Sequence, residues 1–103
     1  MNWRVKKLNH DNAVRDDIRE SSRWYNRKQR GLGLEFRTEL RIAFRAVTRN
    51  PETFPFVESN VRRYVVRRFP FLVYYTVCQN EVRILRVIHT SRDPETWKNN
   101  LKK

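Results

Sequence analysis

The chain has 103 residues, enough for one domain and too few for two, so a single domain over residues 1–103 is expected. Lysine and arginine outnumber aspartate and glutamate by 23 to 11, and the net charge of +12 favours a polyanionic or acidic partner over a neutral one. The lone Cys78 excludes an internal disulfide, and no segment has the apolar length of a signal peptide or a membrane span. We therefore expect a cytoplasmic protein that does not enter a membrane.

A short strand and a helix are expected first. The loose alternation of apolar and polar residues in Trp3–Leu8 predicts the strand. Apolar side chains at helical spacing then predict a helix over Asn12–Lys28, with Trp24 widening its apolar face. A short polar side chain can accept hydrogen bonds from the free amides of a first helical turn, so Asn9 or Asp11 is expected to cap it.

A second helix is expected directly after the first. Gly31 is placed to end the first helix in a left-handed conformation. The second helix ends near Asn50, because Pro51 cannot continue it. Its apolar stripe consists of Phe36, Leu40, Ala43, Phe44 and Val47. The short link makes the two helices an antiparallel hairpin.

Extended segments fill the rest of the predicted fold. Residues 51–59 are expected to form a loop rich in proline, and Gln79–Asn80 suits a tight turn. Three strands are predicted: Val61–Phe69, Phe71–Cys78 and Val82–His89. The predicted fold class is α+β: an N-terminal strand, a helical hairpin, and a three-stranded antiparallel meander with the helices packed on one of its faces.

Both predicted helices carry an arginine at every fourth position. In the first helix these are Arg15, Arg19, Arg23 and Arg27, and Asp11, Asp16 and Glu20 stand three or four residues before one of them. The second helix has Arg37, Arg41, Arg45 and Arg49, and neither of its acids stands three or four residues from any of them. Like charges on one helix face repel each other, so we expect this second row to bind an acidic partner segment.

A second basic cluster falls on the predicted strands. It consists of Arg62, Arg63, Arg67 and Arg68 around Tyr64, Tyr74 and Tyr75. Because consecutive strand residues face opposite sides, one arginine of each pair should face the helices and the other should face away. Two interpretations stay open: a basic aromatic surface that holds phosphates or stacks bases, or arginines at the edge of the core beside packed tyrosines.

Metal and cofactor chemistry are not expected. One cysteine and two distant histidines, His10 and His89, offer no metal-ligand spacing, and the chain has no glycine-rich phosphate loop. RNA cleavage is the one enzymatic reaction that the residues would suit, with arginines stabilising the phosphorane. His89 is the only good general base on the predicted sheet, and at the end of a strand we interpret it as a structural residue.

Six segments in this order resemble the RelE/ParE toxins of bacterial type II toxin–antitoxin systems, and they look most similar to the ParE-type, plasmid-stabilisation branch. They are "DI" (Asp17–Ile18), "WY" (Trp24–Tyr25), "GLGLEFRTEL" (Gly31–Leu40), "NPETFP" (Asn50–Pro55), "RRFPFLVYY" (Arg67–Tyr75) and "VIHTSRDPETW" (Val87–Trp97). The resemblance implies a growth-inhibiting toxin with a helical hairpin against a twisted sheet. It also implies a co-encoded acidic antitoxin, which would meet the second arginine row, and contact with DNA through the toxin–antitoxin complex.

The resemblance leaves two targets open. ParE-like toxins poison DNA gyrase, whereas RelE-like toxins cut messenger RNA on the ribosome with lysines, arginines and a C-terminal tyrosine or histidine. No lysine occurs from Val61 to His89, which favours gyrase. Under the nuclease alternative the candidate catalytic residues are Arg67, Arg68, His89 and Arg92. The candidate target-binding residues are Arg63, Arg68, Tyr75, Arg92 and Lys98, and a plain nucleic-acid-binding module is the third possibility.

Overall fold

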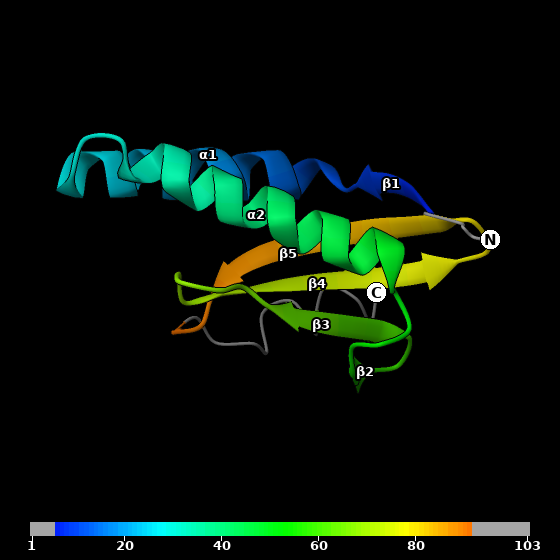
Figure 1. Ribbon diagram of the computed structural model, residues 1–103. Coiled ribbons are helices and arrows are strands. Elements are labelled where there is room, and N and C mark those ends of the chain that lie inside the picture. Colours follow the sequence, from blue (N-terminus) through cyan, green and yellow to red (C-terminus); the bar gives the residue numbers. More distant parts are fainter. Residues whose placement is uncertain (1–5, 92–103) are drawn as a thin grey trace.

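A five-stranded sheet covered on one face by two helices makes up the computed structural model (Figure 1). The structure describes residues 6–91. Its elements are β1 (Lys7–His10), α1 (Asn12–Lys28), α2 (Leu32–Arg49), β2 (Phe56–Glu58), β3 (Val61–Val65), β4 (Phe71–Cys78) and β5 (Glu81–His89). The predicted α+β class is confirmed, with both helices on one face of the sheet.

The sheet has the order β1-β5-β4-β3-β2 and mixes parallel and antiparallel pairs. β1 runs parallel to β5, and its last pair joins His10 to Ile84. The other neighbours are antiparallel, as expected for a meander. The loop predicted over residues 51–59 contains a further strand, β2, which pairs with β3 at the edge opposite β1.

Two predicted strands have different limits in the structure. Of the strand predicted over Trp3–Leu8, residues 3–5 lie outside the described range, and β1 continues to His10. The strand predicted over Val61–Phe69 ends at Val65. After it the chain turns at Arg68, which has a φ of 71°, before β4 begins at Phe71. Residues 66–70 therefore do not alternate between the two faces of the sheet.

The helices match their predicted limits closely. α1 covers the predicted Asn12–Lys28, and α2 is followed by Asn50 as its C-cap. Asp11 is the N-cap residue of α1, but its carboxylate accepts a hydrogen bond from Arg83 of β5 and does not cap the helix amides. Gly31 is left-handed with a φ of 87°, but it directly precedes α2, whereas α1 ends at its C-cap Gln29.

The two helices approach each other closely where the hairpin begins. The Gly33 N–H donates a hydrogen bond of 2.8 Å to the side-chain oxygen of Asn26. A Cβ atom at position 33 would lie 2.5 Å from the backbone oxygen of Ser22, closer than real contacts allow. Glycine is therefore required at position 33 for α2 to pack against α1.

The main core lies between the helices and the sheet. Val14 and Tyr25 from α1 and the predicted α2 stripe pack against Phe71, Val73 and Tyr75 of β4 and against buried residues of β5. The rings of Tyr25, Phe36, Phe69 and Phe71 form a cluster with centroids 4.7–6.2 Å apart. Aromatic contacts of this kind add stability beyond the burial of apolar area.

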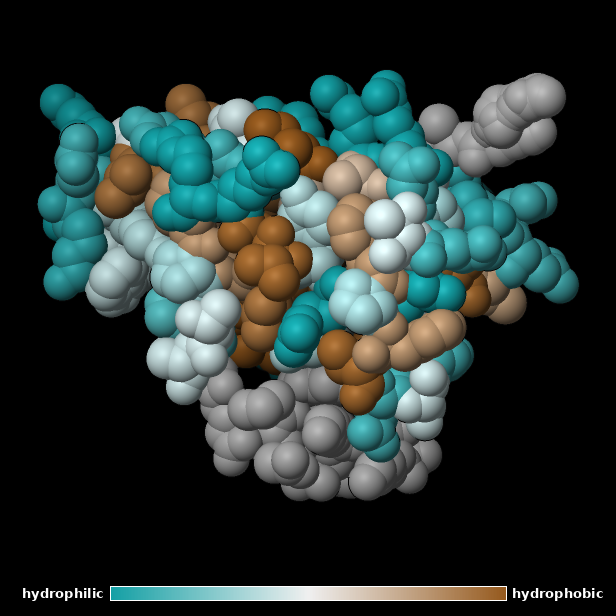
Figure 2. All heavy atoms as spheres, turned by 60° about the horizontal axis from the view of Figure 1, so that its bottom comes forward, coloured by the Kyte–Doolittle hydropathy of each residue, from teal (hydrophilic) through white to brown (hydrophobic). Residues whose placement is uncertain are grey.

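The opposite face of the sheet, here called the helix-free face, is also largely apolar. Alternation along the strands places Val61, Leu72, Tyr74, Leu85 and Ile88 on it, and Val61, Tyr74 and Ile88 are buried. Figure 2 views the molecule from below the sheet of Figure 1 and shows brown hydrophobic side chains between margins of teal hydrophilic ones. The described side chains of this face thus form a second, smaller apolar cluster.

An arginine next to a bulge in β5 is bound by α1. Tyr75 pairs with Ile84 and Tyr74 with Arg86, so Leu85 has no counterpart on β4. The Asp17 carboxylate of α1 accepts two hydrogen bonds of 2.9 Å from the Arg86 guanidinium and one of 3.0 Å from the Val87 N–H. The hydrogen bonds to Asp17 raise the pKa of Arg86. Asp17 therefore binds the edge of β5 beyond the end of β1.

The substitution Asp17→Ala should lower the free energy of unfolding by about 2–4 kcal/mol, because it leaves a mostly buried guanidinium and a backbone N–H without their acceptor. Urea unfolding followed by circular dichroism measures this loss. The matched control is Asp16→Ala in the same helical turn, whose exposed ion pair with Arg19 at 3.7 Å should contribute less than about 0.5 kcal/mol. Equal losses in the two variants would refute this role for Asp17.

Candidate functional site

The four arginines of α2 form an exposed row. Arg37, Arg41, Arg45 and Arg49 are all exposed, as the helical spacing predicted, and this set is called the α2 arginine row below. None of the four forms an ion pair with any other residue of the described range 6–91. The row is therefore an uncompensated positive strip on the outside of the molecule.

The two acids of α2 are engaged by a residue from another element. Arg68, in the turn between β3 and β4, contacts Glu35 at 2.8 Å and Glu39 at 3.5 Å. The hydrogen bond to Glu35 is the main cause of the raised pKa of Arg68. The carboxylates on α2 are thus turned toward the sheet side and leave the α2 arginine row without an acidic neighbour on its own helix.

The first arginine pair on the sheet is divided between the faces, as predicted. Arg62 pairs in register with Tyr75 on the helix side, and its guanidinium donates to the backbone oxygens of Glu52 and Phe54 and stacks 3.8 Å from the Phe56 ring. Arg63 lies on the helix-free face, half-buried, and its Nε atom is buried with no hydrogen-bond partner among residues 6–91. Arg62 therefore has a structural role.

The tyrosines do not form the aromatic binding surface that was one of the two open interpretations. Tyr75, predicted to bind the target, is 0% exposed, and its hydroxyl donates to the backbone oxygen of Pro51 at 2.7 Å. This prediction was wrong, because the side chain faces the helices. Tyr74 is buried on the helix-free face, and Tyr64 packs its ring 5.0 Å from that of Phe54. Burial raises the pKa of Tyr75 to about 12.

The candidate nuclease residues of the described range lie at the same end of the sheet, because Phe71 pairs with His89 and directly follows the turn that carries Arg67 and Arg68. Two of the three are engaged in other contacts. Arg67 is exposed in the turn after β3, and the neighbouring Arg68 is bound to α2. His89 lies at the end of β5, where its ring packs edge-on against Phe71 with centroids 5.1 Å apart. Arg92, like the predicted target-binding residue Lys98, lies outside the described residues.

His89 organises the turn that follows β5. Its Nδ1 atom accepts a hydrogen bond of 3.1 Å from the Ser91 N–H, and the Ser91 hydroxyl lies 2.9 Å from the same atom. A nitrogen that accepts a backbone N–H carries no proton of its own, so the proton of the neutral ring is on Nε2. This geometry agrees with the structural interpretation of His89.

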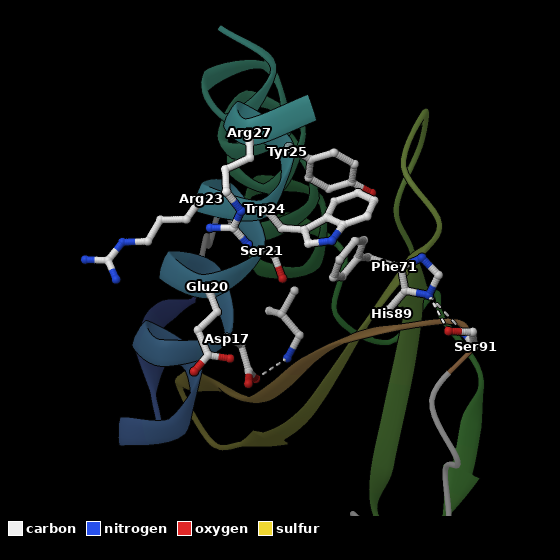
Figure 3. Close-up of a pocket in the computed structure, with 11 residues that line it drawn as sticks. Asp17, Glu20, Ser21, Arg23, Trp24, Tyr25, Arg27, Phe71, His89 and Ser91 are labelled. Atoms are coloured by element: carbon white, nitrogen blue, oxygen red, sulfur yellow. Dashed lines mark hydrogen bonds between the residues drawn. The ribbon is translucent and has the colours of Figure 1, made fainter. Parts of the chain in front are cut away.

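A groove of about 640 Å³ lies between α1 and the end of β5 (Figure 3). Trp24, Tyr25, Phe71 and His89 supply its aromatic lining, and Arg23 and Arg27 lie along its α1 side. Trp24 was expected to widen the buried face of α1 but is 48% exposed. The set of these six residues is called the α1–β5 groove below.

The arginines of α1 are less neutralised than their spacing indicated. Asp16 does contact Arg19, but Asp11 pairs with Arg83 of β5 in place of Arg15. No ion pair joins Glu20 to Arg23 in the part of the chain that the structure covers. Arg23 and Arg27 therefore line the groove from α1 without an ion-pair partner among residues 6–91. In Figure 3 the Arg23 side chain extends away from the aromatic rings, whereas Arg27 lies near Trp24.

The part of the chain that the structure describes contains no group of three histidine, cysteine, aspartate or glutamate side chains suited to a metal ion. Neither of its two helices is long and apolar enough to cross a membrane. The surface features that remain are the α2 arginine row and the α1–β5 groove.

The sequence of the chain matches one known protein family over most of its length. Residues 10–94 match the family model of the ParE toxin of type II toxin–antitoxin systems, parDE. The chain belongs to this family. The match includes both helices and the strands β2 to β5, so it covers the helical hairpin, four of the five strands and the groove. The protein is thus the toxin component of a type II toxin–antitoxin system.

Two solved structures have the same fold as this ParE-family toxin. A chain of the chromosomal ParDE system from P. aeruginosa has a TM-score of 0.75 and 16% identity, over 84% of this chain and 98% of that chain. The isolated E. coli RelE toxin has a TM-score of 0.62 and 18% identity, over 94% of this chain and 96% of that chain. No curated protein sequence matches the toxin.

Two features of this toxin's surface were missed by sequence reasoning. Arg68 contacts Glu35 and Glu39, which lie 33 and 29 positions before it in the sequence. No local sequence pattern predicts a contact over that separation. The groove was missed because Trp24 was assigned to the core. One available signal was the position of Trp24 directly before Tyr25, since adjacent helical residues point in different directions.

The substitution Tyr75→Phe should change how stability depends on pH. Ordinary tyrosine ionises near pH 10, so the stability from keeping this phenol neutral is fully present below pH 10 and is lost as the pH rises toward 12. At pH 7 the variant should be less stable by about 1 kcal/mol, because the Pro51 oxygen loses its donor. By pH 11 the wild type should lose about 1 kcal/mol relative to the variant, which closes this gap.

Urea unfolding of both proteins at pH 7, 9.5 and 11 measures the gap directly. Comparison with the variant cancels the ionisation of the other three tyrosines. A gap that stays constant over this range would contradict the assigned pKa of Tyr75.

Proposed function

We propose that this toxin inhibits bacterial growth by binding and poisoning DNA gyrase in the cytoplasm, and that a co-encoded acidic antitoxin neutralises it by covering the α2 arginine row. The observation that carries the proposal is the α2 arginine row, whose exposed cations have no acidic partner within residues 6–91. Two of the candidate catalytic residues, Arg68 and His89, are engaged in structural contacts. Membership of the ParE family supports gyrase as the target. Contact with DNA would then come through the toxin–antitoxin complex.

The described residues favour action by binding over RNA cleavage. Cleavage needs a base, an acid and cations held around one phosphate. The Arg68 guanidinium is bound by Glu35 and Glu39 of α2, and the Nδ1 atom of His89 accepts a hydrogen bond from the Ser91 N–H. On the helix-free face, Arg63 stands among apolar neighbours. Ribosome-dependent cleavage of messenger RNA remains the alternative that the experiment below tests.

Electrostatics supports an acidic antitoxin on α2. Arg37, Arg41, Arg45 and Arg49 are spaced by four residues, and each neighbouring pair of like charges destabilises a helix by about 0.2–0.5 kcal/mol. A partner carboxylate near these arginines would replace that repulsion with attraction.

Exposed apolar side chains on α2 add a second kind of contact. Leu34 is 65% exposed and Ile42 is 45% exposed, and both lie on the helix that carries the α2 arginine row. The antitoxin segment that fits this helix therefore combines acidic residues with apolar ones.

Reversing two charges in the row should weaken the antitoxin complex. The double variant Arg41→Glu, Arg45→Glu is expected to raise the Kd about 10- to 100-fold at moderate salt, because two attractive contacts become repulsive. Isothermal titration calorimetry with the antitoxin encoded beside the toxin gene measures the change. The control Lys7→Glu, Arg15→Glu alters net charge equally at exposed positions of β1 and α1 and should change the Kd about twofold or less. Equal weakening by both pairs would reject α2 as the docking helix.

Substitution of the candidate nuclease residues tests how the toxin acts. Arg67→Ala should leave toxicity within about twofold of wild type, because Arg67 is exposed in a turn and the proposal gives it no role. His89→Ala should lower the free energy of unfolding by about 1 kcal/mol through loss of its hydrogen bond and ring contact, yet remain toxic.

Induced expression without antitoxin measures the toxicity of both variants, with gyrase supercoiling and transcript integrity followed in the same cells, and urea unfolding measures the stability of His89→Ala. Blocked supercoiling with intact transcripts would support gyrase poisoning. Transcripts cut within codons, together with loss of toxicity in folded Arg67→Ala and His89→Ala, would replace it with the ribonuclease function.

A further inference from the structure

We infer that the α1–β5 groove binds single-stranded nucleic acid, with a base stacked on its aromatic lining and the adjoining phosphates held by Arg23 and Arg27. This site goes beyond the proposed function, because it requires neither antitoxin nor gyrase. It does not use the sheet tyrosines that sequence reasoning had considered for stacking. Those rings are packed inside the fold or against Phe54 and offer no free face to a base.

The aromatic lining offers a surface on which a base can stack. The rings follow one another through the groove: Trp24 to Tyr25 at 5.1 Å, Tyr25 to Phe71 at 6.2 Å and Phe71 to His89 at 5.1 Å. Phe71 and Tyr25 are buried and fix the positions of their neighbours, whereas Trp24 is 48% exposed. Every base has a π-face, so stacking on such a ring is strong and tolerant of sequence.

The cations beside these rings suit phosphate. Arg23 and Arg27 are one helical turn apart on α1, both are exposed, and neither has an ion pair within residues 6–91. A guanidinium binds phosphate oxygens through two parallel hydrogen bonds. Lys28, whose ammonium lies 4.9 Å from the centre of the Trp24 ring, adds a third positive charge at the same end of the groove.

The acids in the groove do not cancel these charges. Asp17 lines the groove, but its oxygens are engaged by Arg86 and the Val87 N–H. Glu20 is the one remaining carboxylate among the lining residues, against two arginines. The unoccupied Nε2 of His89 adds a hydrogen-bonding group at the other wall, which a phosphate or base oxygen can use.

The same geometry disfavours an extended peptide as the occupant. A peptide would add to the edge of β5 beyond β1, where the Val87 N–H points away from β4. The Asp17 carboxylate already accepts that N–H, so an added strand would lose one of the few backbone hydrogen bonds that this short edge can offer. Side-chain stacking and paired guanidiniums remain available, and these are what a nucleotide uses.

Fluorescence anisotropy with labelled ten-nucleotide single strands tests the site in the full-length toxin. Trp24→Ala should weaken binding about tenfold through loss of stacking, and Trp24→Phe should restore most of it. Arg23→Glu with Arg27→Glu should weaken binding at least as much and lower the slope of log Kd against log salt by about 1.4, or about 0.7 for each lost phosphate contact. The control Lys7→Glu, Arg15→Glu should weaken binding about twofold or less.

A matched strand of the same length with abasic sites separates stacking from charge. It should bind wild type about as weakly as the intact strand binds Trp24→Ala. Thermal unfolding of each variant confirms that the fold is retained. Three results would overturn the inference: equal binding of the abasic strand, equal weakening by the groove and control charge pairs, or an acidic peptide that depends on these residues while the oligonucleotide does not.

Discussion

The carboxylate of Asp17 joins α1 to β5, and the α1–β5 groove on the outside of the molecule depends on this contact. β1 pairs with β5 only as far as Ile84, and beyond that point Asp17 binds the strand edge. Side chains four and seven residues further along a helix share a face, so a fixed Asp17 also places Ser21 and Trp24 toward β5. The groove is thus a consequence of one helix-to-strand attachment.

The parts of the fold that follow from local pattern could be predicted from the sequence. The apolar periodicity and Pro51 gave α1 and α2 almost to the residue. β2 was missed because a strand of three residues beside prolines, Phe56–Glu58, has no periodicity to detect, and it exists only because β3 provides a partner. The early end of β3 at Val65 likewise depends on the left-handed turn at Arg68.

The candidate site could be predicted only where one helix determines it. Exposure of the α2 arginine row follows from four-residue spacing opposite an apolar stripe, and the structure agrees. Tyr75 was misplaced because a run of aromatic residues on β4 does not reveal which side of the sheet each one faces until its pairing with β3 is known. The neutralisation expected for α1 is only partly present for a similar reason: Asp16 contacts Arg19, but Asp11 binds Arg83 of β5 in place of Arg15.

The contact of Arg68 with Glu35 and Glu39 also affects how quickly a partner can find the toxin. With both carboxylates of α2 engaged at the turn before β4, the field of the α2 arginine row extends into solvent without local cancellation. Fields of this kind steer oppositely charged molecules and raise association rates toward 10⁸–10⁹ M⁻¹s⁻¹ at low ionic strength, about a hundredfold or more above unsteered encounters. The ion pairs of Arg68 with Glu35 and Glu39 leave the field of the α2 arginine row uncancelled. An acidic chain would therefore associate with this row quickly, and its association rate would depend strongly on salt.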